Sequence, residues 1–248
     1  MADDATRYSR APITEAIIDL RVALPPGHRS ELFSDAFLSS ATDYPKRRQL
    51  SQAISNVEIG TSISTSTVTE PVGWICSSDD DKQIVQFRRD GFTFSRLAPY
   101  GAWEPFRDEA RKLWLAYRAH AAPAGILRLA VRYINQINIP FDAKPLKLED
   151  YFRFYPELPD DEFPPIAHFF VQVQLPQEDI EAVAVVREVR LPPPSESQVS
   201  VLLDIDLFRE EKVPTKDADI WEIFEQLRER KNQIFNRCIT GRTKELIQ

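Results

Sequence analysis

Hydrophobic and polar residues alternate with a period of two over much of the chain, and the longest such stretch is 126–139. Its odd-numbered positions are apolar apart from Asn135, and its even-numbered positions include Arg128, Arg132 and Gln136. Successive side chains of a strand point to opposite faces, so this pattern predicts a long strand with one buried face.

The same reasoning predicts further strands and several helices. Alternation, strand-forming residues and turn signals indicate strands at 13–24, 52–69, 72–77, 82–89, 92–97, 166–175, 182–191 and 198–208. Apolar residues three and four positions apart predict helices at 28–41, 103–120 and 217–239, and a short helix at 148–154. Asp90-Gly91 favours a tight hairpin turn, and the basic residues 46–48 read as a loop.

The element order is similar on the two sides of residue 126. We therefore expect an α+β protein built of two β-α-β3-4-α pseudo-repeats, residues 1–125 and 126–248, that form one compact unit. The repeats would form one or two curved antiparallel sheets with the long helices packed on one face. This arrangement resembles the saddle of the TATA-box-binding type of fold, a likeness of fold that carries no function.

The amino-acid composition and the net charge disfavour several classes of function. Hydrophobic residues make up 43% and charged residues 28%, which is typical of a globular chain. A net charge of −7 disfavours non-specific binding to nucleic acid or to an anionic membrane. There is no apolar run near the ~20 residues of a membrane helix, and the N-terminus has no signal-peptide pattern. Cys76 and Cys238 lie far apart in the sequence and suggest reduced thiols, so we expect a cytoplasmic protein.

Polar positions on three predicted strands supply the candidate ligand- or partner-binding residues. They are Glu15, Asp19 and Arg21, then Arg128, Arg132, Asn135 and Gln136, and finally Asp204 and Asp206. Asp204 and Asp206 would lie on one face roughly 7 Å apart, which suits a polar pocket or a divalent cation. The alternative is a lattice of exposed opposite charges, each pair contributing about 0.2–1 kcal/mol. Two carboxylates are few for a metal, so we predict no metal site.

Asn135 interrupts an otherwise apolar face. A buried amide without partners costs about 1–3 kcal/mol, so Asn135 should bond to the backbone of a loop or contact a ligand or partner.

Four short motifs suggest a family. They are Pro12-Ile13-Thr14-Glu15-Ala16, Arg132-Tyr133-Ile134-Asn135-Gln136-Ile137, Leu203-Asp204-Ile205-Asp206, and Lys231-Asn232-Gln233-Ile234-Phe235 followed by Ile239-Thr240. In this order they resemble a sporadically distributed bacterial family of proteins of about this length. The resemblance implies no activity, cofactor or catalytic residue, and the patchy distribution is compatible with a role in bacterial defence or mobile elements.

We therefore expect a non-catalytic binding module that uses the polar sheet face or the cleft between the halves. Its partner would be a protein or a small ligand, with a homodimer as a further option and no cofactor. With 7 glycines there is little room for a Gly-rich phosphate loop, and no His or Cys falls at zinc spacing. Two alternatives remain. One is an enzyme or sensor for a polar or phosphorylated small molecule, with Arg residues as anion anchors, and the other is a nucleic-acid-binding component.

Overall fold

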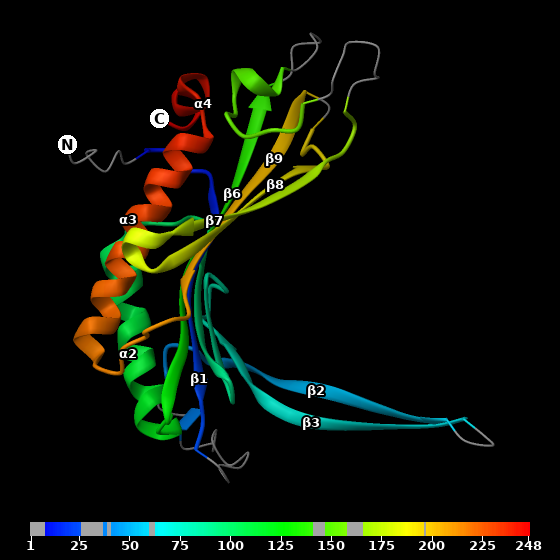
Figure 1. The fold of residues 1–248 in the computed structure, drawn as a ribbon, viewed down its shortest axis with the longest axis vertical. Coiled ribbons are helices and arrows are strands. Elements are labelled where there is room, and N and C mark those ends of the chain that lie inside the picture. The colour runs from blue at the N-terminus through cyan, green and yellow to red at the C-terminus, as the bar shows by residue number, and fades with distance from the viewer. Residues whose placement is uncertain are drawn as a thin grey trace. The chain divides into compact units, whose positions relative to one another are not determined.

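The computed structural model describes residues 8–25, 37–38, 41–59, 63–140, 147–157, 166–195 and 197–248. These residues form a nine-stranded antiparallel sheet whose strands lie in the order β2-β3-β4-β5-β1-β6-β9-β8-β7 (Figure 1). The strands are β1 (Ile13–Ala23), β2 (Lys46–Ile59), β3 (Ile63–Ser77), β4 (Gln83–Arg88), β5 (Gly91–Leu97), β6 (Gly125–Pro140), β7 (Phe170–Gln177), β8 (Ala182–Leu191) and β9 (Gln198–Arg209). The described α-helices are α2 (Trp103–Ala121), α3 (Asp217–Cys238) and α4 (Gly241–Ile247), and short 3-10 turns cover Leu148–Asp150 and Glu178–Ile180.

The predicted fold class is wrong. In place of two α+β pseudo-repeats with long helices packed on one face, the structure is predominantly sheet, with 46% of the described residues in strands and 28% in helices. The residues 46–48, assigned to a loop, and the stretch 52–69, assigned to one strand, belong to two long paired strands. Thr, Val and Ile favour extended backbone throughout this part of the chain. The helix predicted at 148–154 is only a 3-10 turn, and the one predicted at 28–41 lies outside the described residues except at 37–38 and 41.

The chain divides into two compact units. Unit 1 contains Met1–Ile17, Leu97–Tyr100 and Arg128–Gln248, and unit 2 contains Ile18–Arg96 and Gly101–Leu127. β1, β5 and β6 therefore contribute residues to both units.

In unit 2, α2 packs on β4 and β5 through aromatic side chains. The ring centroids of Phe92 and Trp114 are 6.0 Å apart, and those of Phe94 and Phe106 are 5.3 Å apart. These helix residues are buried because the three- and four-residue spacing places them on one stripe.

The hairpin between β4 and β5 depends on Gly91. Its φ is +159°, and a Cβ built there would lie 2.2 Å from the carbonyl oxygen of Leu20. A side chain is therefore excluded by the neighbouring backbone of β1. The predicted hairpin is present, but its two-residue loop is Arg89-Asp90, because Gly91 already pairs with Arg88.

β2 and β3 form a long ribbon in unit 2 (Figure 1). They pair from Lys46 opposite Ser77 to Ile59 opposite Ile63. β3 also pairs with β4 over its last residues, Gly73 to Ser77. Before Gly73, the strand partner of β3 among the described residues is β2.

In unit 1, α3 packs on the face that carries the odd-numbered residues of β6 and β9. The Nζ of Lys231 on α3 lies 3.6 Å from the ring centroid of Tyr133 on β6, and Ile137, Leu203 and Ile205 are buried on the same face. Even-numbered residues of these strands point to the opposite face. The predicted strand at 126–139 is thus confirmed, with its polar side facing away from α3.

Candidate functional site

The polar candidates on the even-numbered face of unit 1 form a network around Asp204. Arg132 donates from Nε to Oδ1 at 2.8 Å and from Nη2 to Oδ2 at 2.7 Å. Arg187, directly opposite Asp204 on β8, donates from Nη1 to Oδ2 at 3.0 Å. We call Asp204, Arg132 and Arg187 the Asp204 clamp, because one carboxylate holds two guanidinium groups.

The clamp combines a buried anion with partly exposed cations. The side chain of Asp204 is 3% exposed, while those of Arg132 and Arg187 are 39% and 25% exposed. Hydrogen bonding to Asp204 raises the pKa of Arg132, so the cation is retained. The second bond of Arg187 runs from Nε to Oε1 of Gln172, at 2.7 Å. Among the described residues, Nη1 of Arg132 and Nη2 of Arg187 have no partner, so each can donate to a bound molecule.

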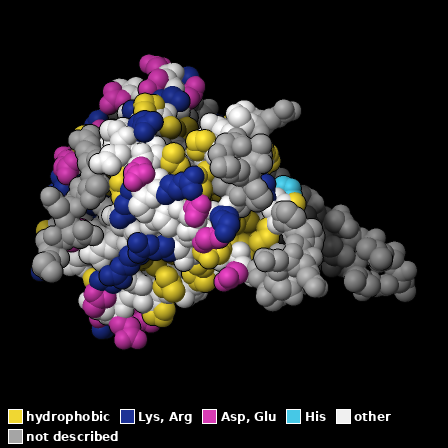
Figure 2. Space-filling model, turned by 90° about the horizontal axis from the view of Figure 1, so that it is seen from above, with side chains coloured by type: hydrophobic (Ala, Val, Ile, Leu, Met, Phe, Trp, Pro, Cys, Tyr) yellow, Lys and Arg dark blue, Asp and Glu magenta, His cyan; other side chains and the backbone are white. Residues whose placement is uncertain are grey.

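An ion pair between Arg128 and Asp206 lies beside the clamp. Nη2 of Arg128 lies 3.0 Å from Oδ2 of Asp206, and its guanidinium lies 4.4 Å from the ring centroid of Phe208. Burial raises the pKa of Asp206. Basic and acidic side chains are also interspersed on the face shown in Figure 2. These contacts are opposite-charge pairs of the kind that the sequence suggested, except that Asp204 is buried rather than exposed.

Gln136 and Asn135 are both engaged with the protein. Nε2 of Gln136 donates to Oγ of Ser200 at 3.0 Å. The buried Asn135 donates from Nδ2 to the carbonyl oxygens of Leu203 at 3.0 Å and of Tyr133 at 3.3 Å. Asn135 thus bonds to strand backbone rather than to a loop, and these bonds account for a polar residue on the apolar face.

Of the remaining candidates, Glu15 lies near the clamp, whereas Asp19 and Arg21 belong to unit 2. Asp19 belongs to unit 2, where its Oδ1 accepts from Thr93 Oγ1 at 2.6 Å and from Arg88 Nη2 at 3.2 Å. Arg21 is exposed in the same unit. Glu15 belongs to unit 1 and is near enough to Arg132 to favour its charged form.

Sequence reasoning missed Arg187 and two buried ionisable residues, Glu188 and Lys231. Residues 182–191 are apolar at both odd and even positions, so alternation could not assign their faces. Lys231 had a usable signal, because it lies four residues after Leu227 and three before Ile234 on the buried stripe of α3.

Glu188 and Lys231 carry strongly perturbed pKa values. Glu188 is 0% exposed, its carboxyl oxygens have no hydrogen-bond partner among the described residues, and burial raises its pKa to about 8. Burial, and then the nearby charge of Arg228, lower the pKa of Lys231 to about 7. Such groups are functional candidates only when a substrate can reach them. We assign them no catalytic role. Neither lines the cavity that Phe37, Phe87 and Leu113 help to form.

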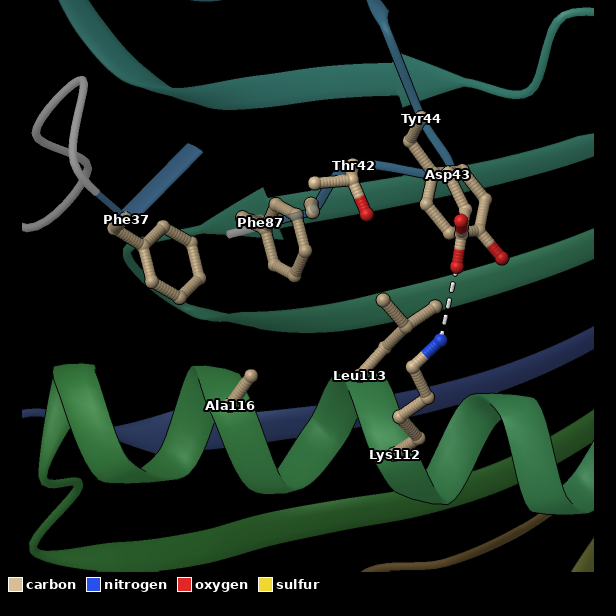
Figure 3. Close-up of a pocket in the computed structure, with 9 residues that line it drawn as sticks. Phe37, Thr42, Asp43, Tyr44, Phe87, Lys112, Leu113 and Ala116 are labelled. Carbon is tan, nitrogen blue, oxygen red and sulfur yellow. Dashed lines mark hydrogen bonds and ion pairs between the residues drawn. The ribbon is translucent and has the colours of Figure 1, made fainter. Parts of the chain in front are cut away.

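That cavity lies in unit 2 (Figure 3). Its volume is about 90 Å³, and its lining includes Phe37, Phe87 and Leu113 with the ion pair between Lys112 and Asp43. Burial and then the charge of Glu109 raise the pKa of Tyr44, another lining residue. A cavity of this size is smaller than the ~150 Å³ that accommodates benzene, so it is a poor candidate for a substrate site.

Two further features are absent from the described residues. No group of three or more His, Cys, Asp or Glu side chains among them could hold a metal ion. None of their helices combines the length and apolar character needed to cross a bilayer. Comparison of the chain with protein-family models, curated proteins and solved structures gave no match.

Proposed function

We propose that unit 1 is a protein-binding module whose contact surface is the sheet face centred on the Asp204 clamp. The observation that carries the proposal is the burial contrast within the clamp. Asp204, 3% exposed, fixes the guanidinium groups of Arg132 and Arg187, which remain 39% and 25% exposed.

Fixed arginines reduce the entropic cost of association. Immobilising a rotamer-rich side chain at an interface costs about 0.5–1.5 kcal/mol. Here, the bonds to Asp204 already restrict both side chains in the folded protein. Arginine is also enriched among the residues that dominate interface energies. The unpartnered Nη donors suit backbone carbonyl or carboxylate oxygens of a partner.

A protein fits this face better than the other ligands we considered. The cavity of about 90 Å³ is lined by residues of unit 2, whereas the clamp belongs to unit 1. Asp204 and Asp206 sit among the arginines, and the chain carries a net charge of −7. Both features weaken attraction to a phosphate backbone.

The test is quantitative co-purification of tagged protein from its native host, followed by mass spectrometry. We would compare the wild type with Arg132→Lys and Arg187→Lys, and use Arg237→Lys on the exposed side of α3 as the matched control. Lysine keeps the charge but loses the planar fork of donors. We expect partner recovery to fall roughly tenfold, or 1.4 kcal/mol, for the clamp variants and to stay unchanged for the control. Melting curves would verify folding. If both clamp variants fold and retain every partner, the clamp is not the contact surface.

A further inference from the structure

The strand β7 forms one end of the sheet that the described residues build, and its outer edge lacks the charges that usually protect such edges. Among the described residues, β8 is its strand partner. The segment 167–177 contains no Lys, Arg, Asp or Glu, although 28% of the chain is charged. Phe170 is 63% exposed and Leu175 is 40% exposed. Natural edge strands are usually protected against pairing by charges, bulges or covering segments.

The backbone register shows which groups of β7 point outward. Phe169 lies opposite Arg190 by continuation of the register, and its carbonyl accepts from the N–H of Arg190 at 3.2 Å. In an antiparallel pair, hydrogen-bonded residues alternate with those whose N–H and C=O point away. Odd-numbered residues of β7 therefore bond to β8, and Phe170, Gln172 and Gln174 direct their backbone groups to the free edge.

Pro176 independently supports this assignment. It lies within β7 at an even-numbered position, where its lack of an N–H removes no bond to β8. Its outward carbonyl accepts from Nε2 of Gln177 at 2.9 Å. The outer edge is thereby closed at one end. Among the described residues, the outward backbone groups of Phe170, Gln172 and Gln174 have no strand partner.

We propose that β7 pairs antiparallel with β7 of a second copy of this chain, about a two-fold axis at Gln172. Self-pairing brings identical side chains together, and like charges placed opposite each other would destabilise the pair. The absence of charge at 167–177 therefore suits a second copy, independently of the proposed function of the clamp.

The register follows from the outward groups. With the axis at Gln172, this residue faces Gln172 of the partner subunit, and Phe170 faces Gln174 of the partner subunit. Three such residue pairs, each exchanging two bonds, use all outward donors and acceptors of Phe170, Gln172 and Gln174. An axis at Val173 would place Phe170 opposite a proline without an N–H, and an axis at Val171 would place Gln174 opposite His168, outside the strand. A five-residue contact is small, so we expect a dimer that dissociates on dilution.

The first test uses the full chain in sedimentation velocity over a series of micromolar concentrations. Gln172→Pro removes one outward N–H and leaves the β8 ladder intact, whereas Gln172→Thr keeps that N–H and is the matched control. We expect wild type and Gln172→Thr to dimerise with increasing concentration and Gln172→Pro to stay monomeric. Circular dichroism melts would verify that both variants fold. A monomeric wild type, or a folded Gln172→Pro that dimerises like wild type, would overturn the proposal.

The second test determines the register without weakening the strand. Val171 would face Val173 of the partner subunit in a non-hydrogen-bonded pair, with a Cα–Cα distance of about 4.5 Å, which permits a disulfide. Val171→Cys and Val173→Cys should therefore cross-link when mixed and oxidised, and neither should cross-link alone beyond the wild-type background. Equal cross-linking of either variant alone would refute this register, and no cross-link in a mixture that still dimerises would place the dimer contact elsewhere.

Discussion

Replacing the buried carboxyl of Glu188 should stabilise the protein, and the gain should grow with pH. Glu188 is 0% exposed, and its oxygens lack hydrogen-bond partners among the described residues. Its pKa rises in the folded protein from 4.5 to about 8, because burial penalises the charged form. Between these two values the folded state binds the proton more tightly than the unfolded state, so stability falls as pH increases.

The size of this loss of stability follows from the difference between the pKa values of Glu188 in the unfolded and the folded protein. At roughly 1.4 kcal/mol per pH unit, the loss between pH 4.5 and about pH 8 is on the order of 5 kcal/mol. The loss is absent below pH 4.5 and complete above pH 8. Glu188→Gln removes the titration with little change in shape, while Glu188→Leu also removes the unpartnered polar atoms.

The assay is urea unfolding of wild type and both variants at pH 5, 7 and 8.5. The free energy of unfolding of wild type should fall across this series by several kcal/mol more than that of either variant. Glu222→Gln, on an exposed position of α3, is the control for changing a Glu to Gln and should follow the wild type. If Glu188→Gln is instead most destabilising at pH 8.5, the carboxylate has a stabilising partner and the reasoning is refuted.

Two further predictions concern stability. Lys231 has its pKa lowered to about 7 by burial and by Arg228, so Lys231→Met should raise the melting temperature most below pH 7, with a gain that shrinks as pH rises toward 10.5. Thermal melts at pH 6 and 9 would measure this, and a larger gain at pH 9 would contradict it. Gly91→Ala should lower stability by about 2 kcal/mol or more through backbone strain and steric conflict with a carbonyl oxygen 2.2 Å away. A Cβ added at Gly125 would have no heavy atom within 4 Å, so Gly125→Ala is the matched control. In a denaturant titration its free energy of unfolding should lie within about 1 kcal/mol of the wild-type value.

The sequence alone determined those elements whose signals are local. Alternation at 126–139 predicted β6, helical spacing predicted α2 and α3, and Asp90-Gly91 predicted the hairpin between β4 and β5. Each signal lies within the few residues that form the element, because side-chain periodicity and turn geometry depend on neighbouring residues. The predicted proportions of helix and strand were wrong. The strands β2 and β3 are longer than predicted, and the helix predicted at 148–154 is a 3-10 turn.

Tertiary structure decided which of these residues meet and which are buried. Asp204 bonds to Arg187 across 17 sequence positions and to Arg132 across 72, and these contacts depend on the strand order and register. The same packing buried Glu188 and Lys231 and placed the uncharged β7 at the end of the sheet. Residue type and spacing indicated polar positions on strands. Strand neighbours from distant parts of the chain determined their partners, and desolvation by those neighbours determined which ionisable groups have shifted pKa values.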